Sequence, residues 1–268
     1  MKLIMLGTGN AMVTKCYNTC FALVDGEQTF LTDAGGGNGI LQQIDKAGIS
    51  YTSIHDMFIT HTHSDHILGA VWLIRKIASL MKQNGYEGCF RIYGHADAVA
   101  ALRTMCELTL AKKFTDFIGE RILLHPVLDG DTITVMNRQL TCFDIHSTKL
   151  LQYGYAIHGE NGYFLTCLGD EPYTETSRSY VAHTEWLLCE AFCRYQDRER
   201  FKPYEKHHST VKDAAELAEQ LSVKNMILYH TEDTALNSRK ADYTAEAKAY
   251  YTGNVYVPDD LDCIDIMP

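Results

Sequence analysis

The sequence predicts an α/β protein in which two sheets pack together and helices lie outside them. Three features of the pattern along the chain carry this prediction, and the composition agrees with it. Apolar strand-like runs alternate with helical patterns in the first third of the chain, a β-rich stretch occupies the middle, and the alternation returns in the last third. A composition of 46% hydrophobic and 22% charged residues over 268 positions is that of a globular chain with a substantial core.

Each expected element has a local reason. Short apolar runs bounded by Gly, Asn or Asp predict strands, and longer segments with apolar residues on one face predict helices. In the first third we expect strands at residues 3–6, 19–24, 29–32, 57–60 and 90–93, with helices at 38–47, 66–82 and 96–111. The middle carries strand candidates at 122–127, 132–135, 140–145, 153–157 and 163–168. The last third continues with a strand at 186–190, a helix at 211–221, a strand at 226–229 and a helix at 241–250. No Pro- or Ser-rich linker interrupts the pattern, so one domain over residues 1–268 is expected.

The charge balance limits the partners of the chain. With 24 Lys and Arg against 34 Asp and Glu, the formal net charge is −10, so the average surface repels polyanions and DNA is not expected as a partner. The apolar runs fall far short of the ~20 residues of a membrane helix, and the apolar start is too short for a signal peptide. Nine scattered cysteines, an odd number, argue against a disulfide framework and favour a cytoplasmic location.

The sharpest chemical feature is the segment Thr-His-Thr-His-Ser-Asp-His at residues 60–66, which joins an apolar strand to a helix. Four ligand-type side chains fall within it: His61, His63, Asp65 and His66. Alternate residues at a strand end share a side, so His61 and His63 are expected to point together. Imidazole and carboxylate are usual ligands for Zn²⁺ and related ions. The alternative is an exposed His-rich loop without metal, but four such residues in this order favour a metal site.

This HxHxDH motif resembles that of the metallo-β-lactamase superfamily, and the resemblance extends over nearly the whole chain. It implies an αββα four-layer sandwich, with two mixed β-sheets flanked by helices. It also implies two divalent metal ions, for which Zn²⁺ is expected and Mn²⁺ or Fe²⁺ are alternatives. Carried over residue by residue, one ion takes His61, His63 and His146, the second takes Asp65, His66 and His230, and Asp170 bridges the two.

A finer resemblance is to ribonuclease Z and its relatives. It rests on the opening Leu-Gly-Thr-Gly-Asn-Ala at 6–11, the Asp-containing glycine turn at 31–37, Cys-Glu-Ala-Phe at 189–192 and His-Ser-Thr at 208–210. It implies that His208 donates a proton to the leaving oxygen and that Glu190 orients it. The alternatives are a structural carboxylate at Glu190 and a helix-start residue at His208.

The chain departs from that group in the region that grips tRNA. The arm that those enzymes insert between the third metal His and the bridging Asp is absent, because only 24 positions separate His146 from Asp170. The acidic residue of the glycine turn is Gly36 here, and the Arg-Tyr pair after the last His is missing after His230. These departures, with the net charge of −10, make tRNA a doubtful substrate.

We therefore expect a dinuclear metal-dependent hydrolase, foremost a phosphodiesterase that uses a metal-bridging hydroxide. Asp65 is expected to orient the nucleophile or accept its proton, with His208 as the acid. A small phosphodiester or RNA is the expected substrate. Alternatives are tRNA 3′-end processing proper, a superfamily esterase or lactonase, and a non-catalytic metal-stabilised binding protein. No membrane partner is expected, and homodimer formation stays open. Basic residues at 194–206 alternate with acidic ones, which favours a solvated segment over a phosphate-binding lip.

Overall fold

The computed structural model describes residues 1–267 and divides into two compact units. The first unit contains Met1–Gly7, Tyr17–Leu128 and Asp260–Met267. The second unit contains Thr8–Cys16 and Asp129–Asp259. Residue 268, the last of the expected domain, lies outside the described residues, and the single domain stays a prediction.

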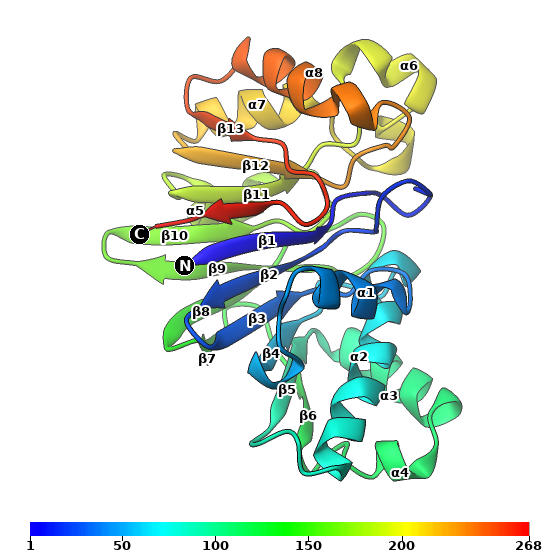
Figure 1. Ribbon diagram of the computed structural model, residues 1–268. Helices are drawn as coiled ribbons and strands as arrows, with labels where there is room; N and C mark the ends of the chain where they lie inside the picture. The colour runs from blue at the N-terminus through cyan, green and yellow to red at the C-terminus, as the bar shows by residue number, and fades with distance from the viewer. Residues whose placement is uncertain (268) are drawn as a thin grey trace. The chain divides into compact units, whose positions relative to one another are not determined.

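The first unit is built on a mixed sheet of seven described strands in the order β14-β1-β2-β3-β4-β5-β6 (Figure 1). The strands are β14 (Cys263–Asp265), β1 (Lys2–Gly7), β2 (Cys20–Asp25), β3 (Gln28–Thr32), β4 (Ile54–Phe58), β5 (Phe90–Gly94) and β6 (Ile122–Pro126). Pairs from β14 to β3 are antiparallel and pairs from β3 to β6 are parallel. The parallel strands end at the same edge of the sheet, and β3 and β4 lead there into residues 33–37 and 59–63.

Helices connect the parallel strands of the first unit and cover its sheet. They are α1 (Gly39–Lys46), α2 (Ser64–Lys82), α3 (Ala96–Thr109) and the short α4 (Lys112–Thr115), with a 3₁₀ turn η1 (Tyr51–Ser53) before β4. The helix α2 buries one face, which includes Leu73, Ile74 and Ile77, against strand residues such as Met57. This apolar stripe at helical spacing fixes α2 on the sheet, and so it fixes the start of the helix that carries the HxHxDH motif.

The second unit repeats the same sequence of pairings in its own mixed sheet of seven described strands, ordered β13-β12-β11-β10-β9-β8-β7 (Figure 1). The strands are β7 (Thr132–Val135), β8 (Arg138–Asp144), β9 (Tyr153–Gly159), β10 (Gly162–Cys167), β11 (Trp186–Glu190), β12 (Asn225–Tyr229) and β13 (Asn254–Tyr256). Pairs from β7 to β10 are antiparallel, and pairs from β10 to β13 are parallel. The carboxyl ends of β10, β11 and β12 therefore meet at one edge.

The helices of the second unit are α5 (Arg178–Val181), α6 (Arg198–Phe201), α7 (Val211–Gln220) and α8 (Leu236–Lys248). Three 3₁₀ turns accompany them: η2 (Glu175–Ser177), η3 (Tyr195–Asp197) and η4 (Tyr204–Lys206). Buried alanines of α7 pack in one core with Tyr243 of α8 and with Leu187 and Leu228 of the strands. Small side chains on α7 let the helix lie close to the sheet.

The strands and long helices expected from sequence are confirmed, with shifts at their ends. The largest shift is in α8, which begins at Leu236 rather than at residue 241. Two edge strands, β13 and β14, were not expected. None of the helices within residues 1–267 is long and apolar enough to cross a bilayer.

Candidate functional site

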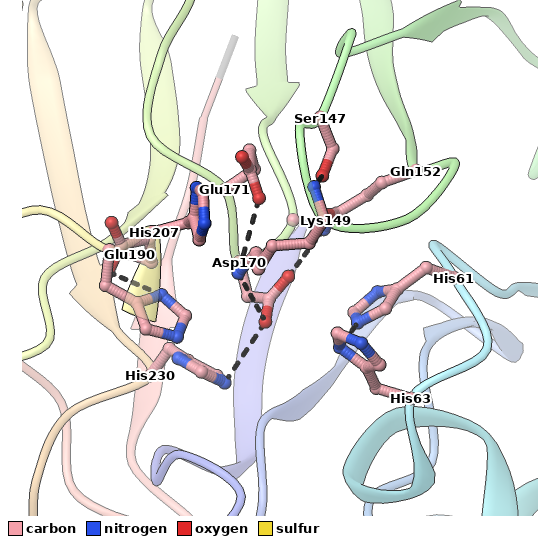
Figure 2. A network of polar contacts seen from close by, with 12 residues as sticks. His61, His63, Ser147, Lys149, Gln152, Asp170, Glu171, Glu190, His207 and His230 are labelled. Atoms are coloured by element: carbon pink, nitrogen blue, oxygen red, sulfur yellow. Dashed lines mark hydrogen bonds and ion pairs between the residues drawn. The ribbon is translucent and has the colours of Figure 1, made fainter. Parts of the chain in front are cut away.

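The first unit gathers the side chains of the HxHxDH motif at the carboxyl end of β4. His61, Asp65 and His66 are buried, and His63 is partly exposed. Nε2 of His61 lies 2.9 Å from Nδ1 of His63, and Nε2 of His66 lies 3.4 Å from Oδ2 of Asp65 (Figure 2 shows His61 and His63). We call these four residues the first cluster. The ring nitrogens and the carboxylate that the sequence predicted to act together do lie together.

Asp33, in the turn after β3, orients two histidines of the first cluster, His66 and His61. Its Oδ2 lies 2.8 Å from Nδ1 of His66 and accepts a 2.8 Å hydrogen bond from the Thr60 hydroxyl. Its Oδ1 accepts from the backbone N–H of Thr60, and the Thr60 hydroxyl lies 2.9 Å from Nδ1 of His61. One carboxylate thus sets the ring orientation of His66 directly and that of His61 through Thr60, as is usual for metal-binding histidines.

The contact between α2 and the turn after β3 fixes the distance from Asp33 to His66. The backbone N–H of Ala34 donates to the carbonyl of His66 at 2.9 Å, and Gly69 donates to the carbonyl of Gly35 at 2.9 Å. A Cβ at Gly69 would lie 1.9 Å from the carbonyl oxygen of Ala34, so only glycine permits this approach. The sequence folds this way because α2 carries glycine where it meets the turn.

The electrostatics of His66 follow from this arrangement. Burial lowers the pKa of the ring, but Asp33 and Asp65 act more strongly together and raise the pKa of His66 above its usual value. A cation at this position, whether a proton or a metal ion, is therefore favoured by two carboxylates. The first cluster has the electrostatics of a cation site.

The second unit gathers Asp170, His208 and His230 at the carboxyl edge of its parallel strands. Ligand-type atoms of these three residues all lie within 4.8 Å of one another. All three side chains are buried, and Nε2 of His230 lies 3.5 Å from Oδ2 of Asp170 (Figure 2). We call them the second cluster. The sequence predicted Asp170 and His230 as ligands and His208 as an acid, and the structure brings these three side chains together.

Gln152, directly before β9, holds Asp170 in place. Its side-chain amide donates a 2.7 Å hydrogen bond to Oδ1 of Asp170, and both residues are buried (Figure 2). Gly169 has φ of +62°, and a Cβ there would lie 2.3 Å from Nε2 of Gln152. Glycine at position 169 thus permits both the left-handed backbone conformation and the close approach of the Gln152 amide. Oδ1 is engaged by Gln152, which directs Oδ2 towards His230.

Glu190 and His208 form a pair next to the second cluster. Glu190 ends β11, is 1% exposed, and its Oε2 lies 3.6 Å from Nδ1 of His208. The other oxygen accepts from the backbone N–H of Ser209. The His208 ring stacks on Phe192, with ring centroids 5.0 Å apart. The α7 capping box of Thr210 and Asp213 begins two residues later, so the helix start holds this segment.

In each cluster, one pair of side chains has a spacing that fits a shared metal ion. Two ligands of one tetrahedral zinc ion, each at about 2.0–2.1 Å, stand about 3.3 Å apart. The separations in the structure are 3.4 Å between His66 and Asp65 and 3.5 Å between His230 and Asp170. Both exceed the usual hydrogen-bond length. The donor set of nitrogen and carboxylate oxygen also suits a divalent ion of this kind.

His146 is arranged differently from the other predicted ligands. It follows β8 with φ of +58° and an exposed side chain, and its Nδ1 lies 3.7 Å from Oδ2 of Asp144. Within its unit it does not join the second cluster. Its role as a ligand stays a prediction, as do the metal-binding and catalytic roles of the other predicted residues.

Sequence reasoning missed the roles of Asp33 and Gln152. Asp33 belongs to a glycine turn that was noticed only as a point of resemblance. Gln152 belongs to no recognisable motif, and a lone Gln directly before a strand gives no signal in one sequence.

Comparisons with known proteins give a family and a fold. A family model described as anti-Pycsar protein Apyc1 matches residues 1–250. A protein named ribonuclease Z from Thermococcus sibiricus is 25% identical over 302 aligned positions, which cover 98% of this chain and 96% of the relative. Because the chain has only 268 residues, that relative carries at least 34 residues that this chain lacks.

Two solved structures share the fold. The metallo-β-lactamase fold protein YhfI from Bacillus subtilis superposes with a TM-score of 0.77 at 16% identity, covering 98% of each chain. The short form of human tRNase Z has a TM-score of 0.75 at 20% identity, covering 100% of each chain. The metallo-β-lactamase fold expected from the sequence, with its two mixed sheets and flanking helices, is confirmed.

Proposed function

The chain belongs to the anti-Pycsar protein Apyc1 family, and from this premise we propose that this metal-dependent hydrolase cleaves small phosphodiesters with two divalent metal ions. The ions would be held by His61, His63 and His146, by Asp65, His66 and His230, and by Asp170 as the shared ligand. The observation that carries the proposal is the Glu190–His208 pair beside Asp170 and His230. Hydrolysis of a phosphodiester with an alkoxide leaving group needs a proton donor for the leaving oxygen, and we assign this role to His208.

Asp65, Glu190 and His208 have different proposed roles in the hydrolysis. Bound divalent ions supply positive charge that polarises the phosphoryl group and lowers the pKa of the attacking water. Asp65 is buried beside His66 and is the group proposed to orient that water or accept its proton. Glu190 accepts from the Ser209 N–H and faces Nδ1 of His208. Glu190 orients the ring of His208 through Nδ1, and the doubly protonated form of the ring can then deliver the proton on its other nitrogen to the leaving oxygen.

A second candidate is tRNA 3′-end processing, favoured by full-length similarity to proteins named ribonuclease Z. Four features argue against it as the main activity. Asp170 follows His146 by only 24 positions, and most of the residues between them belong to β9 and β10. The chain is shorter than that relative and carries a net charge of −10. The cations of the 194–206 segment are also engaged, since Arg194 contacts Asp197 at 2.8 Å and Asp242 at 3.1 Å.

The test compares hydrolysis of bis(p-nitrophenyl) phosphate with cleavage of a 3′-extended precursor tRNA, using protein whose Zn, Mn and Fe contents are measured. We expect cleavage of the small diester alone, lost after chelation and in His63→Ala. The matched control is His183→Ala, which removes an exposed histidine. Comparable cleavage of both substrates would favour tRNA processing. Metal-loaded protein that cleaves neither would overturn the phosphodiesterase proposal and direct the search to carboxylic esters, lactones or a binding role.

A further inference from the structure

The segment that follows β8 presents a lysine to the second cluster. Nζ of Lys149 lies 3.3 Å from Oε2 of Glu171 and 3.9 Å from Oδ2 of Asp170 (Figure 2). The Lys149 side chain is only 15% exposed. All of these residues belong to the second unit. The ammonium group therefore lies beside the carboxylate oxygen that faces His230.

The backbone around Lys149 is held in place by local contacts. The Ser147 hydroxyl accepts from the N–H of Lys149 at 3.2 Å, and Oε1 of Glu171 accepts from the N–H of Thr148 at 3.4 Å. The Thr148 hydroxyl lies 2.8 Å from Nδ1 of His207. Glu171 thus binds the segment through one oxygen and the ammonium group through the other, which orients the lysine.

The contacts of Lys149 leave its ammonium group able to bind an anion. A charge-assisted hydrogen bond between nitrogen and carboxylate usually measures about 2.7–2.9 Å. The separations of 3.3 Å and 3.9 Å are longer than that. An ammonium group carries three donors. Lys149 therefore lies close to two carboxylates but forms a short charge-assisted hydrogen bond with neither.

Two other lysines of this unit differ from Lys149 in their exposure. Lys202 lies 3.0 Å from Glu199 and has a half-exposed side chain, and Lys224 pairs with Glu185 with a side chain that is 69% exposed. Exposed pairs of this kind are screened by water and contribute little. Lys149 is a sheltered cation, and it lies next to a proposed metal ligand.

We propose that Lys149 binds a phosphoryl oxygen of the substrate, with Glu171 as the residue that positions it. The inference rests on the proposed function, because it takes Asp170 as a metal ligand and a phosphodiester as the substrate. A phosphoryl group bound beside Asp170 lies within reach of the flexible lysine stem, and the ammonium group offsets part of its negative charge. Glu171 is closer to Nζ than Asp170 is, so it keeps the lysine from neutralising the carboxylate that the metal needs.

The test separates phosphate binding from metal binding in the metal-loaded protein. For Lys149→Met we expect KM for bis(p-nitrophenyl) phosphate and Kd for inorganic phosphate, measured by calorimetry, to rise roughly 10- to 100-fold. We expect metal affinity, measured by chelator competition, to stay equal or become tighter because a cation has been removed. Lys149→Arg should recover part of the phosphate affinity. Lys224→Met is the matched control, since it removes an exposed lysine.

Loss of Lys149 alone leaves two buried carboxylates, Glu171 and Asp170, side by side without their cation, which destabilises the fold. A second variant therefore controls for misfolding. Lys149→Met combined with Glu171→Gln keeps the charge balance and should show the same loss of phosphate affinity. Unchanged phosphate Kd in both variants would overturn the inference, even if metal affinity or thermal stability fell. If the wild-type protein cleaves no diester but loses phosphate affinity with Lys149, the phosphate site stands and the proposed function fails.

Discussion

Nδ1 of His66 lies 2.8 Å from Oδ2 of Asp33, a carboxylate 33 positions earlier in the chain. The contact fixes which ring nitrogen of His66 is turned inward to the carboxylate, so Nε2 is the atom turned towards Asp65. The same carboxylate reaches His61 through Thr60. One buried aspartate therefore sets the orientation of two proposed metal ligands.

Asp33→Asn should weaken metal binding by roughly 10- to 100-fold, because the amide cannot hold both His66 and Thr60 as the carboxylate does. Competition with a chromophoric chelator measures this. Asp56→Asn is the control, since Asp56 on β4 binds Arg91 at 2.6 Å and 2.8 Å in the same unit. It should lower the melting temperature without changing metal affinity. Equal losses of affinity in the two variants would show that Asp33 acts only through stability.

Gly169→Ala and Gln152→Ala should be strongly non-additive in metal affinity and in free energy of unfolding. The added Cβ would displace the Gln152 amide from Asp170, and the left-handed backbone costs about 1–2 kcal/mol. In the double variant the clash has gone, so the summed effects should exceed the observed one by about 0.5 kcal/mol or more. Gly130→Ala, at φ of +83° with open space around it, should show the backbone cost alone. Simple additivity would contradict the proposed contact.

His208→Ala should lower kcat by roughly 10²–10⁴-fold for diesters with an alkoxide leaving group. The loss should be much smaller for bis(p-nitrophenyl) phosphate, because p-nitrophenolate leaves without a proton. Glu190→Gln should show the same dependence on the leaving group with a smaller loss. Steady-state kinetics on the two kinds of substrate measure it, with His183→Ala as control. An equal loss on both substrates would assign His208 to metal or substrate binding.

The raised pKa of His66 predicts a pH dependence for the metal-free protein. Protonated His66 stabilises the fold through Asp33 and Asp65, so this contribution is fully present below the usual imidazole pKa. It is lost as the pH rises through the higher pKa of the folded state. A metal ion must displace this proton, so metal affinity should fall as the pH drops below that value. Melting curves of metal-free wild type and His66→Gln should converge at high pH; parallel curves would contradict the assignment.

The sequence predicted those parts of the fold that depend on local patterns. The runs that became β7 and β11 were predicted with the bounds that the structure has. The strands β13 and β14 were missed because each has only three residues and forms by pairing at a sheet edge. The first turns of α8 were missed because Asn237, Ser238 and Arg239 give no apolar stripe there. Arg239 is nevertheless buried, where it binds Thr8, Thr231 and Asp259.

The same distinction between local patterns and long-range contacts applies to the candidate site. The HxHxDH motif is contiguous, so its residues and their proximity could be predicted from spacing and resemblance. The contacts of Asp33 with His66 and of Gln152 with Asp170 join separate loops. Their existence depends on how α2 meets a glycine turn and on space at Gly169, which no local pattern records. The exposed position of His146 likewise depends on the path of the chain after β8.

The pairing of β1 with β14 has a consequence for how the chain folds as it is made. Lys2 pairs with Asp265 and Ile4 with Cys263, so one edge of the first sheet is completed by segments far apart in the sequence. On the ribosome, β1 must wait for more than two hundred further residues before this neighbour emerges. Until then its outer hydrogen-bonding groups offer a template to other strands. Slow synthesis would therefore prolong the interval in which the nascent chain depends on chaperones to avoid aggregation.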